Sequence, residues 1–280
     1  MIKYSKKDIN KIKKWGMKTN PFVAIHDYSD LKAEKRWENK EHLKAYNRYW
    51  LRRKRWSENK NFVRYYKKAS KPIDRKTWEY LKLRKSYYIM PLGWENIAKN
   101  GGNILDVGCG DGDVTQNLID YIISYWKKNK LKGKKITIYG LDVNKSRIEN
   151  CKKLVQSKSN KIKTIFLVDD MAKKRFNRFK KNFFNYCLCT GVLEILSEKH
   201  NDIFLSRISK IVSKGIYIED LFELFPGGFP RNNLGYHLLK KKFHVKKRHV
   251  IFSEPFNKFK LSDPKKIWPI NLDQNIWAEK

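Results

Sequence analysis

The 280-residue chain is long enough for one large domain or for a domain with an appendage, and 41% hydrophobic content is enough for a packed core. Its longest apolar runs are far too short for a membrane span, and the amino terminus lacks the apolar segment of a signal peptide. We therefore expect a cytoplasmic protein with no transmembrane segment. Four cysteines (Cys109, Cys151, Cys187 and Cys189) include no C-x-x-C pair, so neither a disulfide framework nor a metal site is expected.

The net charge of +35 comes from 63 lysines and arginines against only 28 acidic residues. A basic protein of this kind can have an anionic partner, such as RNA or another polyanion. The codon bias of an AT-rich genome is the alternative, because Lys, Asn, Ile, Tyr and Phe are all abundant. That bias also supplies Glu, so it does not account for the whole excess.

Residues 1–85 predict a basic, aromatic-rich helical cap. The stretch 31–66 contains no Pro or Gly, and its aromatic residues are interleaved with the basic run Arg52–Arg55. Such a cap can dock its aromatic side chains on a core and expose its charges to solvent. Alternatively, basic and aromatic residues together can bind single-stranded RNA by phosphate contact and base stacking.

The segment after the cap predicts a strand, a glycine turn and a helix. Ile104, Leu105 and Val107 form a short apolar run, as in a buried parallel strand. Glycines at 108, 110 and 112 follow, and apolar residues then recur at helical spacing from Val114 to Ile123. Glycine allows a sharp turn and a close approach of the backbone to a ligand. A nucleotide-like ligand is expected here, at the carboxyl end of the strand and facing a helix amino terminus.

Two further strands follow, each ending in an acidic residue. The second strand, Ile136–Asp142, precedes Asn144, which is a good N-cap for the next helix. Asp142 is placed to accept hydrogen bonds from a ribose diol. The third strand begins at Lys163 and ends at the doublet Asp169–Asp170. Because strands and helices alternate across 103–252, we predict an α/β fold with a doubly wound, mostly parallel sheet.

The stretch 103–115 resembles motif I of the class I S-adenosylmethionine-dependent methyltransferases, whose form is hydrophobic-hydrophobic-Asp-hydrophobic-Gly-x-Gly-x-Gly. The third glycine of the dinucleotide fingerprint is replaced by Asp113. The resemblance implies a Rossmann-like fold that binds S-adenosyl-L-methionine. It implies that Asp142 binds the ribose, that Asp170 with Met171 binds the adenine (Asp169 being the alternative), and that Thr190 faces the amino-acid part. The complete set of implied cofactor-binding residues is Asp106, Gly108, Cys109, Gly110, Asp142, Val143, Asp170, Met171 and Thr190.

The stretch from Phe184 to Leu196 resembles motif IV of small-molecule methyltransferases, with Val192-Leu-Glu194 at its centre, although Ile195 stands where the family often has His. It lacks the Asn/Asp-Pro-Pro-Tyr/Phe loop of base-amine methylation and the Pro-Cys of pyrimidine methylation. An oxygen acceptor needs a base, and we name Glu194 and His237 as catalytic candidates. Asp220 and Tyr236 are further candidates near the same edge.

The remainder of the chain predicts a fifth strand at Lys214–Asp220, then a Gly/Pro-rich loop at 221–233 placed as an acceptor lid. A helix at 231–242 and an edge strand or hairpin at 243–252 follow. We divide the chain into the cap (1–85), a methyltransferase domain (86–256) and a carboxyl-terminal tail (257–280) on or beside the core. We expect this tail to pack as an irregular strap or to be partly mobile.

From these expectations we predict a methyltransferase that acts on an oxygen or nitrogen atom of a small molecule, lipid or sugar. One alternative is an RNA methyltransferase that uses the basic amino-terminal region as its RNA platform. The other is a non-catalytic binding module on the same fold.

Overall fold

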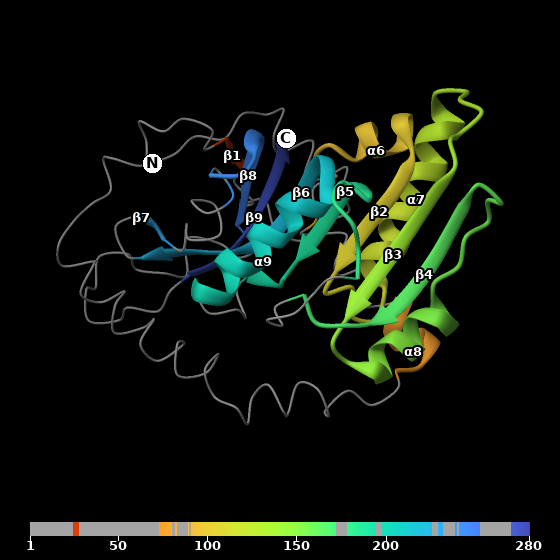
Figure 1. The fold of residues 1–280 in the computed structure, drawn as a ribbon, viewed down its shortest axis with the longest axis horizontal. Helices are drawn as coiled ribbons and strands as arrows, with labels where there is room; N and C mark the ends of the chain where they lie inside the picture. Colours follow the sequence, from red (N-terminus) through yellow and green to blue (C-terminus); the bar gives the residue numbers. More distant parts are fainter. Residues whose placement is uncertain are drawn as a thin grey trace.

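The structure, a computed structural model, describes residues 25–27, 73–79, 82, 89, 91–171, 178–193, 198–225, 229–231, 239, 241–252 and 270–280. Within these residues a single mixed sheet is covered by helices on both faces (Figure 1). The helices are α6 (Trp94–Asn100), α7 (Asp113–Lys128), α8 (Lys145–Leu154) and α9 (Glu198–Ile211). The strands are β1 (Ile25–Asp27), β2 (Gly102–Val107), β3 (Ile136–Asp142), β4 (Ile162–Val168), β5 (Phe184–Thr190), β6 (Val212–Phe225), β7 (Phe229–Arg231), β8 (His244–Phe252) and β9 (Ile270–Glu279).

The order of strands across the described sheet is β1-β8-β9-β6-β5-β2-β3-β4. Strands β4, β3, β2, β5 and β6 are parallel to one another, whereas β9 lies antiparallel between β6 and β8. The parallel part of the sheet therefore starts in its middle at β2, extends outward through β3 and β4, and continues with β5 on the other side of β2. Ligands bind at such a reversal, at the carboxyl ends of the strands.

Two hydrophobic clusters, one on each face, hold the helices to the sheet. Side chains alternate along β2, because Ile104 belongs to the cluster under α6, α7 and α8 and Leu105 belongs to the cluster under α9. Both side chains are fully buried. Burial of one such side chain contributes roughly 1.5–3 kcal/mol to folding. The doubly wound, mostly parallel sheet predicted from the sequence is thus confirmed.

Local signals account for the elements around the first three strands. The predicted bounds of the second strand agree with β3, and Asn144 is the N-cap of α8, as predicted. Its side-chain oxygen accepts hydrogen bonds from the backbone N–H groups of Ser146 (2.9 Å) and Arg147 (3.3 Å). Gly112 precedes α7 with φ of +83°, a left-handed conformation that favours glycine.

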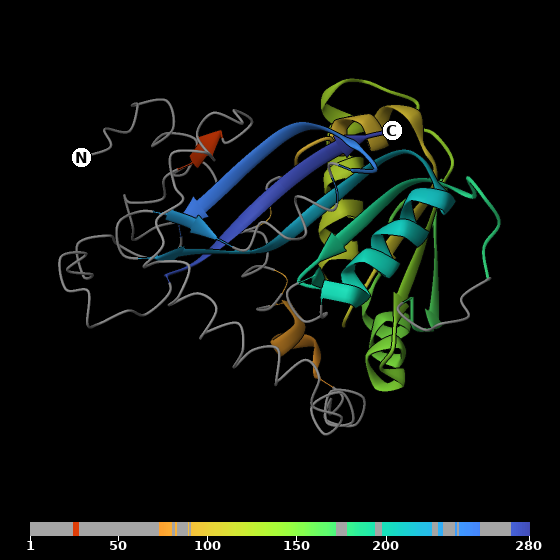
Figure 2. The same cartoon turned by 60° about the vertical axis from the view of Figure 1, so that its left-hand side comes forward.

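Two predictions about the second half of the chain are corrected. Strand β6 continues to Phe225 and pairs antiparallel with β7, so strands occupy 221–225 and 229–231 of the segment predicted as a loop at 221–233. The predicted irregular tail contains β9, which is inserted between β6 and β8 and forms backbone ladders with both. Figure 2 shows β6, β8 and β9 running side by side as the longest strands of the sheet. In β9, Ile276 and Ala278 belong to the hydrophobic cluster on the α9 face of the sheet, whereas Trp277 belongs to the cluster on the other face. Side chains that alternate between two buried faces in this way are those of a strand inside a covered sheet.

Most of the predicted cap lies outside the described residues. The part that the structure describes near its end, 73–79, packs against the core through Trp78, which is completely buried. The described region of the chain contains no helix with the length and apolarity needed to cross a lipid bilayer.

Candidate functional site

The residues implied as cofactor ligands lie at the carboxyl ends of four neighbouring parallel strands. The glycine loop, defined as Gly108–Gly112, follows β2, and Asp142 ends β3 with Val143 after it. Thr190 ends β5, and Asp170 follows β4. Because β4, β3, β2 and β5 are adjacent in this order, the sheet brings these residues to one edge.

The glycine loop folds back over the end of β3. The backbone N–H groups of Gly108 and Cys109 both donate to the carbonyl oxygen of Leu141, at 2.7 and 3.0 Å. All three glycines have positive φ, between +57° and +83°. A Cβ on Gly108 would lie 2.3 Å from Val192 Cγ2, and one on Gly112 would lie 2.4 Å from Val155 Cγ2. These two glycines are therefore required for close packing of the protein on itself.

Gly110 differs from the other two glycines of the loop. A Cβ at this position would meet only the end of the Arg147 side chain, at 3.3 Å. The neighbouring protein therefore does not demand a glycine here, apart from its φ of +57°. Close approach of a ligand to the backbone is the remaining reason for a glycine, as at the second glycine of dinucleotide-binding loops.

Asp142 connects the glycine loop to β3. Its Oδ2 accepts a hydrogen bond from the Gly110 backbone N–H at 3.1 Å, and its Oδ1 accepts one from the Asn144 backbone N–H at 2.8 Å. The residue is only 3% exposed. Burial raises the pKa of the Asp142 carboxyl, while the Asn144 N–H, the Arg147 guanidinium and the Gly110 N–H act in the opposite direction. The two remaining lone-pair positions of this carboxylate can accept further hydrogen bonds.

The two other carboxylates near the glycine loop point into the protein. Asp106 is fully buried, and its Oδ2 accepts a hydrogen bond from the Thr115 hydroxyl in the first turn of α7. Asp111 accepts a hydrogen bond from the Asn150 amide at 2.9 Å and lies 3.9 Å from Arg147 Nε. In the structure these two carboxylates fix α7 and α8 to the loop.

Cys109 contributes its backbone to the loop and its side chain to the core. Its thiol is buried, and its sulfur lies 4.0 Å from the sulfur of Cys151 on α8. The hydrogen bond with Cys151 and the burial both raise the pKa of the Cys109 thiol well above its usual range. The thiol therefore stays protonated and does not act as a nucleophile at this edge.

In the acidic doublet after β4, Asp169 makes the contacts that join this segment to its neighbours. The Asp169 carboxylate lies 2.7 Å from Arg178 Nε and accepts a hydrogen bond from the Asp170 backbone N–H at 2.8 Å. Its own N–H donates to the Asp142 carbonyl, which joins the ends of β4 and β3. Met171 is 4% exposed and belongs to the cluster on the α9 face of the sheet.

The segment after β5 closes the same edge. Thr190 is 6% exposed, and Val192 packs directly over Gly108. Leu193 is buried, and its carbonyl accepts a hydrogen bond from the Asn201 amide at 3.0 Å. The two catalytic candidates, Glu194 and His237, lie outside the described residues.

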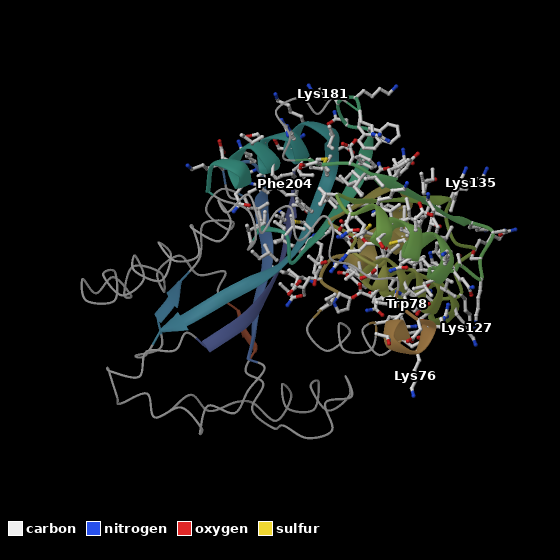
Figure 3. The ribbon with its side chains drawn as sticks, turned by 90° about the horizontal axis from the view of Figure 1, so that it is seen from below. Lys76, Trp78, Lys127, Lys135, Lys181 and Phe204 are labelled. Carbon is white, nitrogen blue, oxygen red and sulfur yellow. The ribbon has the colours of Figure 1, made fainter. Side chains whose placement is uncertain are left out.

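Trp78 is a contact of the glycine loop that sequence reasoning missed. Its indole Nε1–H donates to the Asp111 carbonyl oxygen at 2.9 Å, across 33 positions of sequence. Arg75 covers the indole ring from 4.9 Å and donates to the Leu154 carbonyl at the end of α8. Figure 3 shows Trp78 against the body of the domain, with the neighbouring Lys76 pointing outward. No local sequence pattern predicts a contact at this separation, because nothing distinguishes Trp78 from the other aromatic residues of the predicted cap.

Comparison with known proteins agrees with this geometry. The model of a family described as a methyltransferase domain matches residues 98–224, which include the glycine loop, Asp142 and Thr190. No curated protein sequence matches the chain.

Among solved structures, the chain is similar to an S-adenosylmethionine-dependent methyltransferase from Methanosarcina mazei, with a TM-score of 0.46 and 15% identity over 69% of this chain and 98% of that one. It is also similar to magnesium protoporphyrin IX methyltransferase from Synechocystis, with a TM-score of 0.46 and 11% identity over 82% and 98% of the two chains. A third similar structure is the N-methyltransferase NodS from Bradyrhizobium japonicum, with a TM-score of 0.44 and 12% identity over 82% and 97%.

The family match covers the strands that carry the glycine loop, and the observed strand order places that loop at the reversal point of the sheet. The glycine spacing and the acidic end of β3 agree with motif I and with the residue expected to bind a ribose. Residues 98–224 therefore match a methyltransferase domain, and their strand order and glycine loop agree with the class I S-adenosylmethionine-dependent methyltransferase fold that motif I implies.

Proposed function

We propose that the protein transfers a methyl group from S-adenosylmethionine to an oxygen or nitrogen atom of a small molecule. The observation that carries this proposal is the contact between the Gly110 backbone and the buried Asp142 carboxylate at the carboxyl edge of the sheet. At this contact, the Gly110 backbone leaves space for a ligand, and the Asp142 carboxylate can accept hydrogen bonds from a ribose diol. A nucleoside ligand needs both features.

The residues at this edge fit the cofactor. Gly110 leaves room for a ligand against the backbone, and Asp142 retains acceptor capacity after its two backbone hydrogen bonds. We keep Asp170 with Met171 as the proposed adenine partners, with Asp169, whose carboxylate lies 2.7 Å from Arg178 Nε, as the alternative. Thr190 is the proposed neighbour of the amino-acid part, because β5 adjoins β2 on the side away from β3.

Bound S-adenosylmethionine supplies a methyl group that its sulfonium already activates. The contribution left to the chain is to orient the two reactants and exclude water. Correct alignment can account for on the order of 7–11 kcal/mol of a reaction barrier. The loop is suited to this task, because hydrogen bonds with Asp142, Leu141 and Trp78 fix its backbone. We keep Glu194 and His237 as proposed bases for an oxygen acceptor.

A small acceptor is favoured by the segment after β5. Val192 and Leu193 lie close against the glycine loop and the core, so apolar side chains narrow this part of the edge. The segment also lacks the proline-containing loops that hold a flipped base in nucleic-acid methyltransferases. The RNA alternative rests on the basic amino-terminal region and has no contact of the described site in its favour.

Transfer of labelled methyl groups tests the acceptor class. The full-length protein would be incubated with methyl-labelled S-adenosylmethionine and either a small-molecule extract or total RNA. We expect label in the small-molecule fraction with wild type, near-complete loss with Asp142→Asn, and retention with Asp111→Asn as the matched control. Label in RNA alone would replace the small-molecule proposal with the RNA alternative. Cofactor binding without transfer to either pool would favour a non-catalytic module.

A further inference from the structure

The amino ends of the strands, opposite the cofactor edge, carry a concentrated positive charge. The segment 127–135 holds six lysines in nine residues, and all six are exposed: Lys127, Lys128, Lys130, Lys132, Lys134 and Lys135. We call this segment, together with the nearby Lys161, the lysine rim. The sequence from 121 to 141 contains no acidic residue. In the described part of the chain, no carboxylate lies within ion-pair distance of these lysines.

The lysine rim is a fixed structure. The backbone N–H of Leu131 donates to the Trp126 carbonyl at 2.9 Å, and the Trp126 indole N–H donates to the Ala98 carbonyl at 2.7 Å. Gly133, with φ of +72°, lets the chain lie against the Trp126 ring, where a Cβ would come within 2.8 Å of ring carbon. Lys161 Nζ donates to the Lys132 and Gly133 carbonyls and ties the entrance of β4 to the segment.

An exposed leucine lies among the lysines of the rim. Leu131 is 44% exposed, although every residue that precedes or follows it in the turn is polar, basic or glycine. Only one other large hydrophobic residue among those described, Val168, is as exposed, and it belongs to the cofactor edge. The backbone bond of Leu131 to Trp126 fixes its position, so the exposed side chain is a consequence of the loop geometry.

The same basic surface continues toward β5 and β6. Exposed Lys181 precedes β5, and exposed Lys214 lies at the start of β6. Burial lowers the pKa of the Lys280 ammonium group, and the nearby charge of Lys181 lowers it further. Figure 3 shows Lys127, Lys135 and Lys181 at the periphery of the fold with their side chains directed outward.

We propose that the lysine rim docks the protein on an anionic lipid bilayer, with Leu131 entering the headgroup region. Lysines with long apolar stems around one exposed leucine match an interfacial anchor, since the charges attract anionic headgroups and the leucine adds buried apolar area. The rim contains neither arginine nor an exposed aromatic side chain, which are the groups that bind single-stranded RNA by forked hydrogen bonds and stacking.

Docking through the lysine rim leaves the cofactor edge accessible. The two edges are separated by the length of β3, which at seven residues is about 20 Å. The glycine loop would therefore face away from the lipid, open to the aqueous phase. This inference does not depend on the identity of the acceptor.

Sedimentation with lipid vesicles tests the proposal. The full-length protein would be mixed with vesicles of phosphatidylcholine alone, or with vesicles of phosphatidylcholine and phosphatidylserine in equal parts. We expect binding only to the mixed vesicles, and weaker binding as salt rises. Because each basic residue near such a surface changes partitioning about fivefold, Lys128→Gln with Lys132→Gln should weaken binding on the order of twentyfold.

Two further variants separate the explanations. Leu131→Ser should weaken vesicle binding several-fold at unchanged charge. Lys76→Gln with Lys153→Gln removes the same charge from exposed positions outside the lysine rim and should have a much smaller effect. Equal weakening by both double variants would overturn the proposal, as would equal binding to both kinds of vesicle. RNA binding that falls with the Lys128 and Lys132 changes, with no effect of Leu131→Ser on vesicles, would assign the surface to RNA instead.

Discussion

Replacing Gly110 and Gly112 by alanine should separate ligand binding from folding within one loop. Both glycines have positive φ, so each alanine pays about 1–2 kcal/mol for a left-handed conformation. At Gly112 the new Cβ would also lie 2.4 Å from Val155 Cγ2 and 3.1 Å from Cys151 Sγ. Overpacking of this kind adds about 1–3 kcal/mol. We therefore expect Gly112→Ala to lower the free energy of unfolding by about 2–5 kcal/mol in total.

At Gly110 the added methyl group would meet only the flexible end of Arg147, so the loss of stability should stay at about 1–2 kcal/mol. The same methyl group would occupy the space proposed for the cofactor, and binding of S-adenosylmethionine should fall at least about tenfold, a change of about 1.4 kcal/mol. Denaturant unfolding gives the stabilities, and calorimetry gives the affinities. Equal stability of the two variants, or unchanged cofactor affinity in Gly110→Ala, would refute this assignment of the loop.

Two further predictions concern the contacts that hold the loop. Trp78→Phe should cost about 1–3 kcal/mol by leaving the Asp111 carbonyl without its indole donor, and it should weaken S-adenosylmethionine binding. Trp126→Phe is the control, because it removes the indole hydrogen bond to the Ala98 carbonyl at the opposite edge of the sheet. It should lower stability and leave the affinity for S-adenosylmethionine unchanged. Equal cofactor affinity in the two variants would show that Trp78 has only a structural role. Because burial raises the folded-state pKa of Asp142, its contribution to stability is full below its unfolded pKa and is lost as pH rises through the folded value. Unfolding measured against pH should show this loss in wild type but not in Asp142→Asn, whereas cofactor affinity should fall on acidification through the same window, because a protonated carboxyl accepts fewer hydrogen bonds.

The sequence predicted the central part of the fold because its signals are local. The apolar run before Gly108, the N-cap at Asn144 and the acidic end of β3 each specify a conformation within a few residues, and the structure confirms these elements. Parallel strands then bring their carboxyl ends together, so the residues implied by the family motif meet at one edge.

The carboxyl-terminal part was mispredicted because its structure depends on distant pairing. The apolar and polar residues of 270–279 alternate only loosely, and β9 forms because β6 and β8 offer backbone on both sides. The direction of the carboxylates at Asp106 and Asp111 also depends on partners on α7 and α8. In the same way, the bond from Trp78 to the loop needs the folded arrangement of segments that are far apart in sequence.

Calorimetric titration of the full-length protein with S-adenosylmethionine and with S-adenosylhomocysteine tests the central claim most directly. The account predicts that wild type binds both ligands, that Asp142→Asn weakens both by at least about tenfold, and that Asp111→Asn changes neither by a comparable amount. Folded wild-type protein that binds neither ligand would contradict the assignment of the glycine loop and Asp142 as a cofactor site.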